Sequence, residues 1–338
     1  MNHFSQTLVQ TLTDGIAVGA LYALIALGYT LVFGILQFIN FAHSDIFALG
    51  AWLSYAIAVG LLRLNAFAAH PLLLAICVPL GAIALCSLVG FCIERFAYRP
   101  LRSAPRLNVL ITAIGVSLLL ENIGQLNTPL RHGAYPPAHT IPGKLVSVVL
   151  HTQWTFGPYP QAMPAILPDK VLFTMAGVQF RLIDATVLIV AIALMALMQF
   201  IIYRTKFGMA MRAVSFNVKT AALMGINVDR VISLTFVTGS ALAAAAGFLY
   251  AMKYPQLQQT ASSVWVLLGL KAFVAAVVGG IGNVRGAMLG GLLIGLIEFF
   301  GVQYLSSDYR DVYVFLVLIL VLLIRPQGLL GRATVEKV

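Results

Sequence analysis

The residues whose side chains could do chemistry lie, in this sequence, within long apolar stretches. Glu298 stands well inside one apolar run and Lys271 inside another, while Glu121 is near the end of a third. His43 and Asp45 belong to a short polar interruption. Charged groups are costly in such surroundings and usually face a bundle interior. We expect Glu298 to have a pathway or packing role, with a protonated or snorkelling carboxyl as the alternative, and His43 to be a hydrogen-bonded structural residue rather than a ligand.

Several kinds of catalytic site are excluded. No G-x-x-x-x-G-K-[ST] phosphate loop occurs, so the chain cannot itself hydrolyse a nucleotide. Gly280, Gly282 and Gly286 do not form a dinucleotide fingerprint, because position 285 is Arg and no strand precedes them. There is no H-E-x-x-H zinc pattern and no credible Ser/His/Asp set. The three cysteines fit buried apolar positions and not metal or disulfide chemistry: Cys77, Cys86 and Cys92. We expect no catalytic residue, metal or cofactor in this chain.

The elements that must position these residues are membrane helices. Apolar residues make up 60% of the 338, charged residues only 9%, and the mean hydropathy is +0.95. A hydrocarbon core about 30 Å thick needs roughly 20 helical residues to cross it, and only helices or closed barrels satisfy their backbone there. We predict an all-α, polytopic membrane protein with eight or nine segments, some broken or re-entrant, forming one domain over residues 1–338. The candidate segments are residues 15–36, 46–62, 71–93, 109–126, 182–202, 231–251, 265–281, 286–305 and 312–324. The last has only 13 uninterrupted apolar residues, so we expect it to extend into Tyr309 or Arg325 by snorkelling.

Basic residues gather in three loops and indicate the orientation. Twelve of the 21 lie there: Arg95, Arg99, Arg102, Arg106, Arg204, Lys206, Arg212, Lys219, Arg230, Arg325, Arg332 and Lys337. The positive-inside rule places all three loops in the cytoplasm. The net charge of +10 is therefore explained by a bilayer and not by nucleic acid. We predict a multi-pass protein of the bacterial inner membrane, surrounded by lipid; the side of the N-terminus depends on whether a short segment is re-entrant.

Residues 127–181 form a long excursion between two segments whose other ends are cytoplasmic. The stretch holds eight of the 14 prolines, together with Trp154 and two tyrosines. We predict an ordered or partly ordered periplasmic excursion. Loops of this length are usually functional or disordered, so contact with an outer partner and a tolerated insertion are both open.

Two polar or glycine-rich interruptions fall at comparable places in the two halves, at residues 40–45 and 279–286. In transporters such paired interruptions expose helix ends and backbone groups to a central path for polar solutes. The alternative is a tight turn at each place, with Asn40 as a helix cap, Asp45 at the next helix N-terminus and glycines that permit close packing. The candidate pathway residues are Asn40, His43, Ser44, Asp45, Gly279, Gly280, Gly282 and Glu298.

The most specific cytoplasmic feature is the basic loop at residues 203–230. Its pattern predicts two short helices, with Asn217 as the cap of the second and Gly225 at its C-terminal end. A short amphipathic helix on a basic loop can lie on anionic lipid or insert into a groove on a partner protein.

Five stretches of this sequence carry a resemblance to a known family. They are residues 19–30 (GALYALIALGYT), 40–43 (NFAH), 225–231 (GINVDRV), 279–282 (GGIG) and 325–328 (RPQG). In this order they closely resemble the permease subunits of bacterial branched-chain amino acid ABC importers, the LivH type. Ser44 stands where family members usually carry Gly, and the excursion at 127–181 looks longer than is typical for the family.

The resemblance implies the fold of an ABC importer permease and a set of partners. The implied partners are a second homologous permease subunit, two cytoplasmic ATP-binding subunits that use ATP and magnesium, and a periplasmic substrate-binding protein. Residues 203–230 then correspond to the coupling loop that docks into the ATPase, a role the resemblance favours over lipid contact. The residues expected to form its core are Gly208, Arg212, Asn217, Ala221, Ala222, Gly225 and Ile226.

The leading functional expectation is import of leucine, isoleucine and valine. A same-family permease for urea, short amides or other amino acids is the alternative within this class. An ion- or proton-coupled secondary transporter, using Glu298 or Asp45 as the coupling site, is the alternative from another class.

Overall fold

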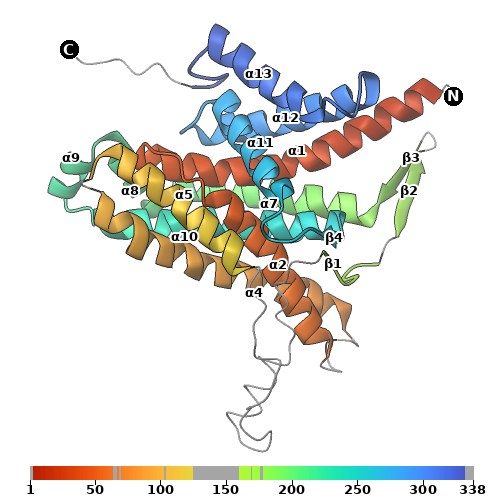
Figure 1. The fold of residues 1–338 in the computed structure, drawn as a ribbon, viewed down its shortest axis with the longest axis horizontal. Coiled ribbons are helices and arrows are strands. Elements are labelled where there is room, and N and C mark those ends of the chain that lie inside the picture. Colours follow the sequence, from red (N-terminus) through yellow and green to blue (C-terminus); the bar gives the residue numbers. More distant parts are fainter. Residues whose placement is uncertain are drawn as a thin grey trace, which may run out of the picture.

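The computed structural model describes residues 3–63, 67, 70–102, 104–124, 160–168, 170–175 and 178–331, and helices dominate it (Figure 1). The longer helices are α1 (His3–Leu36), α2 (His43–Leu62), α4 (Pro71–Cys92), α5 (Arg106–Ile123), α7 (Leu182–Arg204), α10 (Val228–Lys253), α11 (Ser263–Gly279), α12 (Val284–Tyr304) and α13 (Arg310–Ile324). Shorter elements are the π-helix η1 (Ile93–Tyr98), the 3-10 helix η2 (Arg99–Leu101), α8 (Lys206–Phe216) and α9 (Val218–Leu223).

The predicted helical membrane fold is confirmed, but the count of eight or nine spans is not. Among the described residues, six helices are long and apolar enough to cross a membrane: α1, α2, α4 with its π and 3-10 extension, α7, α10 and α12. The remaining three, α5, α11 and α13, have 18, 17 and 15 residues. The last helix was expected to extend into Tyr309 or Arg325. Both residues flank α13 and are not part of it, so the helix does not extend to them.

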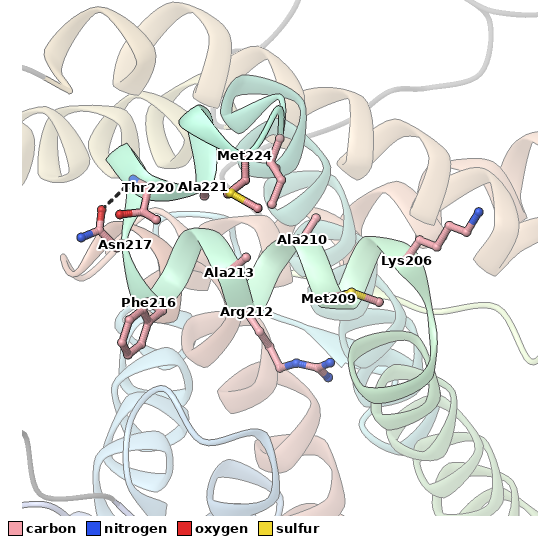
Figure 2. Close-up of a pocket in the computed structure, with 11 residues that line it drawn as sticks. Lys206, Met209, Ala210, Arg212, Ala213, Phe216, Asn217, Thr220, Ala221 and Met224 are labelled. Carbon is pink, nitrogen blue, oxygen red and sulfur yellow. Dashed lines mark hydrogen bonds between the residues drawn. The ribbon is translucent and has the colours of Figure 1, made fainter.

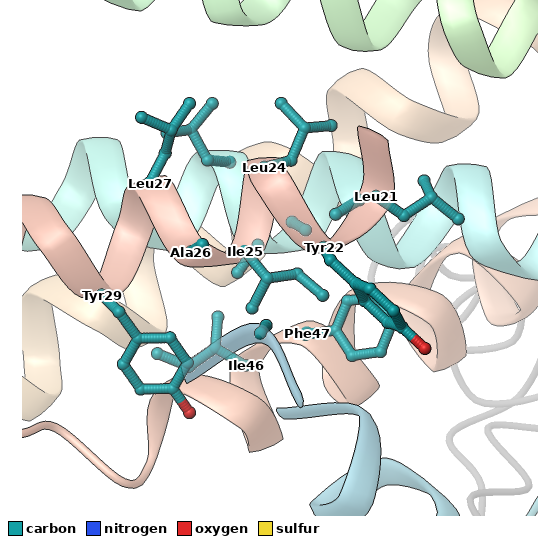
Figure 3. Packing of buried hydrophobic residues seen from close by; sticks show 14 of the residues in the cluster. Leu21, Tyr22, Leu24, Ile25, Ala26, Leu27, Tyr29, Ile46 and Phe47 are labelled. Atoms are coloured by element: carbon teal, nitrogen blue, oxygen red, sulfur yellow. The ribbon is translucent and has the colours of Figure 1, made fainter. Parts of the chain in front are cut away.

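Helix α1 is the central element, and its middle is almost completely buried. It packs antiparallel to α12 through small residues: an added Cβ on Gly19 would lie 3.0 Å from the Leu292 Cα, and one on Gly15 would lie 3.3 Å from the Leu296 Cα. The small residues thus let the backbones of the two helices approach closely. Figure 3 shows the apolar side chains of α1 together with Ile46 and Phe47 of α2.

Four short strands, which the all-α expectation did not include, form two antiparallel pairs. They are β1 (Gln161–Ala162), β2 (Val171–Met175), β3 (Val178–Arg181) and β4 (Gln256–Leu257). Strand β1 pairs with β4, and β2 pairs with β3. The β2–β3 pair lies at the opposite end of the molecule from α8 and α9 (Figure 1). Within the 127–181 excursion the structure describes β1, β2, β3 and the residues next to them, whereas residues 127–159 lie outside the described residues, so the expected ordered or partly ordered periplasmic excursion stays a prediction.

A non-helical segment, residues 254–262, joins α10 to α11 and is held by two tryptophans. The indole N–H groups of Trp52 and Trp265 both donate to the Gln258 carbonyl, over 3.0 and 3.2 Å. Both side chains are buried. Non-helical backbone is tolerated inside a membrane protein only where protein groups satisfy it. These indoles supply such partners for a chain interruption that the sequence pattern did not single out.

Candidate functional site

The basic loop at residues 203–230, called the coupling loop after the role that the resemblance implies, folds as the sequence pattern predicts, into two short helices with a defined cap between them. Thr205 precedes α8, and its hydroxyl accepts a hydrogen bond from the Gly208 N–H over 3.1 Å. Asn217 then ends α8 and starts α9, since its side-chain oxygen accepts from the Thr220 N–H over 2.9 Å. The predicted Asn217 cap is therefore confirmed.

Gly225 ends α9 in the left-handed conformation, with a φ of +81°. The Gly225 N–H donates to the Ala222 carbonyl and the Ile226 N–H to the Ala221 carbonyl, over 3.0 and 3.1 Å. This pair of bonds is the Schellman arrangement, which favours glycine at the left-handed position. The predicted C-terminal role of Gly225 is confirmed, and the chain turns sharply there toward α10.

Between α8 and α9 lies an apolar groove with a cavity volume of about 810 Å³ (Figure 2). It is lined by Lys206, Met209, Ala210, Arg212, Ala213, Phe216, Asn217, Thr220, Ala221, Met224 and Ile226. Three large apolar side chains on these helices are strongly exposed: Phe216 and Leu223 at 88% and Met224 at 77%. Exposed apolar surface of this kind, bordered by basic groups, is typical of a protein interaction site.

Other coupling-loop residues face the body of the protein and anchor the groove. A Cβ on Gly208 would collide with the carbonyls of Ile201 and Ile202, so only glycine lets α8 fold back on α7. The Arg212 guanidinium donates to the Ile202 carbonyl over 2.5 Å, and the Ser215 hydroxyl donates to the Gly34 carbonyl over 2.5 Å. Gly208 and Arg212 thus position the groove.

The residues predicted to form the core of the coupling loop are mainly small or polar. The prediction did not include the loop's strongly exposed apolar residues. Ala221 is buried and Ala222 is exposed, while Phe216, Leu223 and Met224 provide the large apolar surface. A signal for them was present in the sequence, because large apolar residues recur within this short segment that also carries Lys206, Arg212 and Lys219.

The first interruption lies between α1 and α2, and its polar residues are buried against neighbouring helices. Asn40 does not cap α2, which corrects one of the two sequence interpretations: the residue before the helix is Ala42, and no side chain caps it. The Asn40 side-chain oxygen instead accepts from the Tyr98 hydroxyl over 2.5 Å. Asp45 does lie in the first turn of α2, as that interpretation expected, and it accepts from the Ser117 hydroxyl over 2.5 Å.

His43 and Ser44 pack tightly at the start of α2. The His43 ring lies against Gly28, where an added Cβ would overlap it, and its centroid is 4.7 Å from that of Tyr29. The Ser44 hydroxyl donates to the Phe41 carbonyl over 2.9 Å, and a Cβ on Gly269 would overlap Ser44. Three buried polar atoms near this interruption have no hydrogen-bond partner among the described residues: Thr30 Oγ1, Asn40 Nδ2 and His43 Nε2. His43 is buried as a structural histidine would be, and its role in a path stays a prediction.

The second interruption is a tight turn between α11 and α12. Gly280 and Gly282 adopt left-handed φ values of +105° and +89°, and Asn283 caps α12 by accepting from the Arg285 and Gly286 N–H groups. A Cβ on Gly279 would collide with the Gly286 backbone, so the two helices touch at this point. The geometry here is that of the tight-turn alternative.

The segment after α13 covers this turn. Leu329 and Leu330 donate their N–H groups to the carbonyls of Val278 and Gly279, over 2.8 and 3.0 Å, and the Asn283 side chain donates to the Leu330 carbonyl over 2.7 Å. The last carbonyls of α11 are thus satisfied by residues that come some fifty positions later in the sequence.

Glu298 is fully buried at the centre of a closed ionic cluster. It accepts from the Tyr22 hydroxyl over 2.8 Å and from the Lys271 amine over 2.9 Å, and it also pairs with Arg310. Lys271 pairs in addition with Asp311 over 2.6 Å. The two acids, Glu298 and Asp311, balance the charges of the two bases, Lys271 and Arg310. The hydrogen bonds and ion pairs of this cluster join α1, α11, α12 and α13. The packing role expected for Glu298 has a physical basis in this cluster, and a pathway role stays a prediction.

Comparison with known proteins gives the family. The family described as "Branched-chain amino acid transport system / permease component" matches residues 11–322. The chain belongs to this permease family. The resemblance deduced from the five sequence stretches is confirmed, and the chain is a multi-pass membrane protein of the permease type.

Individual relatives match nearly end to end. The high-affinity branched-chain amino acid transport system permease protein BraD of Pseudomonas aeruginosa is 39% identical over 98% of both chains. The corresponding protein LivH of Escherichia coli K12 is 40% identical over 98% of this chain and 97% of its own length. A probable branched-chain amino acid transport permease protein LivH of Methanocaldococcus jannaschii is 30% identical over 92% of this chain and 89% of its own. The residues that match the family therefore include the coupling loop, both interruptions and the ionic cluster.

Proposed function

We propose that this permease family member is the membrane-spanning subunit of an ATP-driven importer that carries leucine, isoleucine and valine across the bacterial inner membrane. The observation that carries the proposal is the identity of about 40% along 98% of the chain to proteins named as high-affinity branched-chain amino acid permeases. The relatives' names support the substrate class, and the groove between α8 and α9 supports contact with a separate ATP-binding subunit.

The groove supports docking of a separate ATPase. The chain has no phosphate loop, so the energy of ATP, with its magnesium, enters through another protein and no cofactor is held by this chain. A short helix pair with exposed Phe216, Leu223 and Met224, carried on a basic loop, fits a groove-type protein contact. The proposed assembly has a second homologous permease, two ATP-binding subunits and a periplasmic binding protein.

Within this assembly the residues of the coupling loop divide by role. Asn217 and Gly225 define the ends of α9, Gly208 and Arg212 hold α8 against the membrane helices, and the exposed apolar residues contact the ATPase. Substrate passes beside the α1–α2 interruption, where polar atoms of Thr30, Asn40 and His43 have no partner among the described residues.

Deletion of the gene and reconstitution of the complex test the proposal. We expect deletion to abolish high-affinity uptake of radiolabelled leucine, isoleucine and valine, and reconstituted complex to import them only with ATP inside the cytoplasmic compartment. Loss of urea or short-amide uptake with branched-chain uptake untouched would overturn the substrate class. Gradient-driven transport by the purified chain alone, without ATPase subunits, would overturn the ATP-driven mechanism in favour of a secondary transporter.

A further inference from the structure

A bridging arginine connects two carboxylates at the end of the molecule that carries the coupling loop. The Arg102 guanidinium pairs with Glu94 through one terminal nitrogen and with Asp229 Oδ1, over 2.6 Å, through the other. Arg99 pairs with the second oxygen of the same Asp229. Asp229 lies in the first turn of α10, immediately after the coupling loop's helices and the Asn227 cap. Asp229 is thus the member of this ionic cluster that follows α9 most closely along the chain.

The partner elements of the cluster are irregular helices. Glu94 is fully buried in the π-helix η1, which continues α4, and Arg99 belongs to the 3-10 helix η2 that follows. π-helical turns are rare and frequently mark functional positions. The Nε of Arg102 has no hydrogen-bond partner among the described residues. The arginine thus has an unused donor that an alternative pairing can satisfy.

From η1 the contacts continue to the first interruption in the membrane. Tyr98, the last residue of η1, packs its ring 5.4 Å from that of Phe236 and 5.3 Å from that of Phe38, measured between centroids. Its hydroxyl donates to the Asn40 side chain over 2.5 Å. The Asn40 carbonyl in turn accepts from the His43 N–H over 3.1 Å, at the start of α2.

A second set of contacts fixes the same segment to α10. The Ser233 hydroxyl, one helical turn beyond Asp229, donates to Glu94 over 2.5 Å. Glu94 is therefore held by α10 both directly and through Arg102. The π-helix cannot shift relative to α10 without breaking charged hydrogen bonds, which are roughly twice as strong as neutral ones.

We propose that Glu94, Arg99, Arg102 and Asp229 form a relay that couples movement of the coupling loop to the α1–α2 interruption, with Arg102 as its positioning residue. The proposal rests on the proposed function, because it assigns a route by which the ATPase contact reaches the membrane path. Displacement of the coupling loop moves Asp229; the two arginines transmit the displacement to η1 and η2; Tyr98 passes it to Asn40. The proposal is argued from a continuous set of ion pairs, hydrogen bonds and ring contacts that runs from Asp229 through η2 and η1 to Asn40.

A second ionic bridge, at the opposite end of α10, offers a matched control. Lys253 also bridges two carboxylates: its amine donates to Asp14 over 3.2 Å and to Asp184 over 2.5 Å, and its side chain is largely buried. It lies at the C-terminal end of α10, whereas Asp229 lies at the N-terminal end. Lys253→Met therefore removes a comparable ionic bridge without touching the relay.

The first experiment measures coupling in the complete complex, reconstituted with its ATPases and binding protein. We expect Arg102→Met to lower the amount of substrate transported per ATP hydrolysed about fivefold or more, the lower end of common coupling factors, while ATP hydrolysis continues. Lys253→Met should leave this ratio unchanged even where it lowers thermal stability. Arg99→Met, which keeps Glu94 paired with Arg102, should lower the ratio in the same direction by less. An unchanged ratio in Arg102→Met, or an equal fall in Lys253→Met, would overturn the relay.

The second experiment does not depend on the substrate. Hydrogen exchange of the peptide at residues 38–47 is followed in the complex with and without ATP under conditions that block hydrolysis. We expect ATP to change exchange of this peptide in wild type and in Lys253→Met but not in Arg102→Met. The same response in all three proteins would overturn the relay. If the wild-type complex imports no branched-chain amino acid, the proposed function fails, and the exchange measurement still decides the relay.

Discussion

At the scale of single residues, Glu298 illustrates how a charge is accommodated in an apolar bundle. Its carboxylate accepts from Tyr22, Lys271 and Arg310, which come from three other helices, and Asp311 balances the second positive charge. A buried ion pair contributes little net stability when it is intact, because desolvation offsets the attraction. Removing one partner is different, since the charges left behind are buried and unpaired. The cluster therefore specifies how α13 docks more than it adds stability.

Substitution of the central carboxylate tests this account. Glu298→Gln should lower the free energy of unfolding by about 1–3 kcal/mol, because Lys271 and Arg310 lose their fully buried counter-ion and Lys271 keeps only Asp311, which is partly exposed. The measurement is thermal or denaturant unfolding of the purified chain in detergent. Asp308→Asn, at an exposed acid near the start of α13, should change stability by less than about 0.5 kcal/mol. The double variant Glu298→Gln/Lys271→Met should recover part of the loss; a double variant as unstable as the sum of two single losses would contradict the pairing.

At the scale of elements, α9 depends on its two ends. It has only six residues, and so short a helix is not stable alone, because nucleation costs more than one turn of hydrogen bonds returns. The Asn217 side chain satisfies its first N–H groups, and Gly225 closes its last carbonyls. The orientation of Leu223 and Met224, which form much of the exposed apolar surface, therefore depends on two local caps.

Removal of the N-terminal cap should disorder this surface. Asn217→Ala should cost the α9 segment about 1 kcal/mol and reduce the amount of ATPase that co-purifies with the tagged chain. Asn217→Asp keeps an oxygen in the capping position and should retain the ATPase at near wild-type levels. Both variants should express and unfold like wild type, since the residue is exposed and lies outside the membrane helices. Equal ATPase recovery with Asn217→Ala and wild type would show that the cap does not shape the contact surface.

At the scale of the whole molecule, the N-terminus and the coupling loop lie at opposite ends (Figure 1). Phe4 of α1 contacts Tyr304 at the end of α12, with ring centroids 6.2 Å apart, whereas α8 and α9 project from the other end. The basic loops indicate that the end of the molecule carrying the coupling loop is cytoplasmic. Helix α1 begins at the opposite end. We therefore predict that the N-terminal end of α1 lies on the outer side of the membrane.

Cysteine labelling tests this topology. In a background lacking Cys77, Cys86 and Cys92, a membrane-impermeant maleimide should label Phe4→Cys in intact spheroplasts. Leu223→Cys, equally suited because the residue is strongly exposed, should react only after the membrane is opened. Labelling of Leu223→Cys in intact spheroplasts, or protection of Phe4→Cys, would reverse the orientation.

The features that could be predicted from sequence are those determined by neighbouring residues. The Asn217 cap, the left-handed Gly225 and the glycine contacts between helices each follow from local residue type and spacing. Asn40 was interpreted as a local cap, but its partner Tyr98 is 58 positions away and competes successfully for its oxygen. The β1–β4 pair, the 254–262 segment and the Arg102 bridge to Asp229 likewise depend on distant partners. No single-sequence pattern encodes them, because the pairing is decided by tertiary packing.

The cover that residues 325–331 place over the α11–α12 turn has a consequence for biogenesis. A chain is synthesised from its N-terminus, so the α11–α12 hairpin enters the membrane before the residues that cap its exposed carbonyls exist. Until residues 325–331 are synthesised, that hairpin has open acceptors at its turn, and a truncation just after Ile324 would leave them open permanently. This segment is in this sense a latch that closes only after α13 has been made, and a chain truncated after Ile324 should be exposed to membrane quality-control proteases.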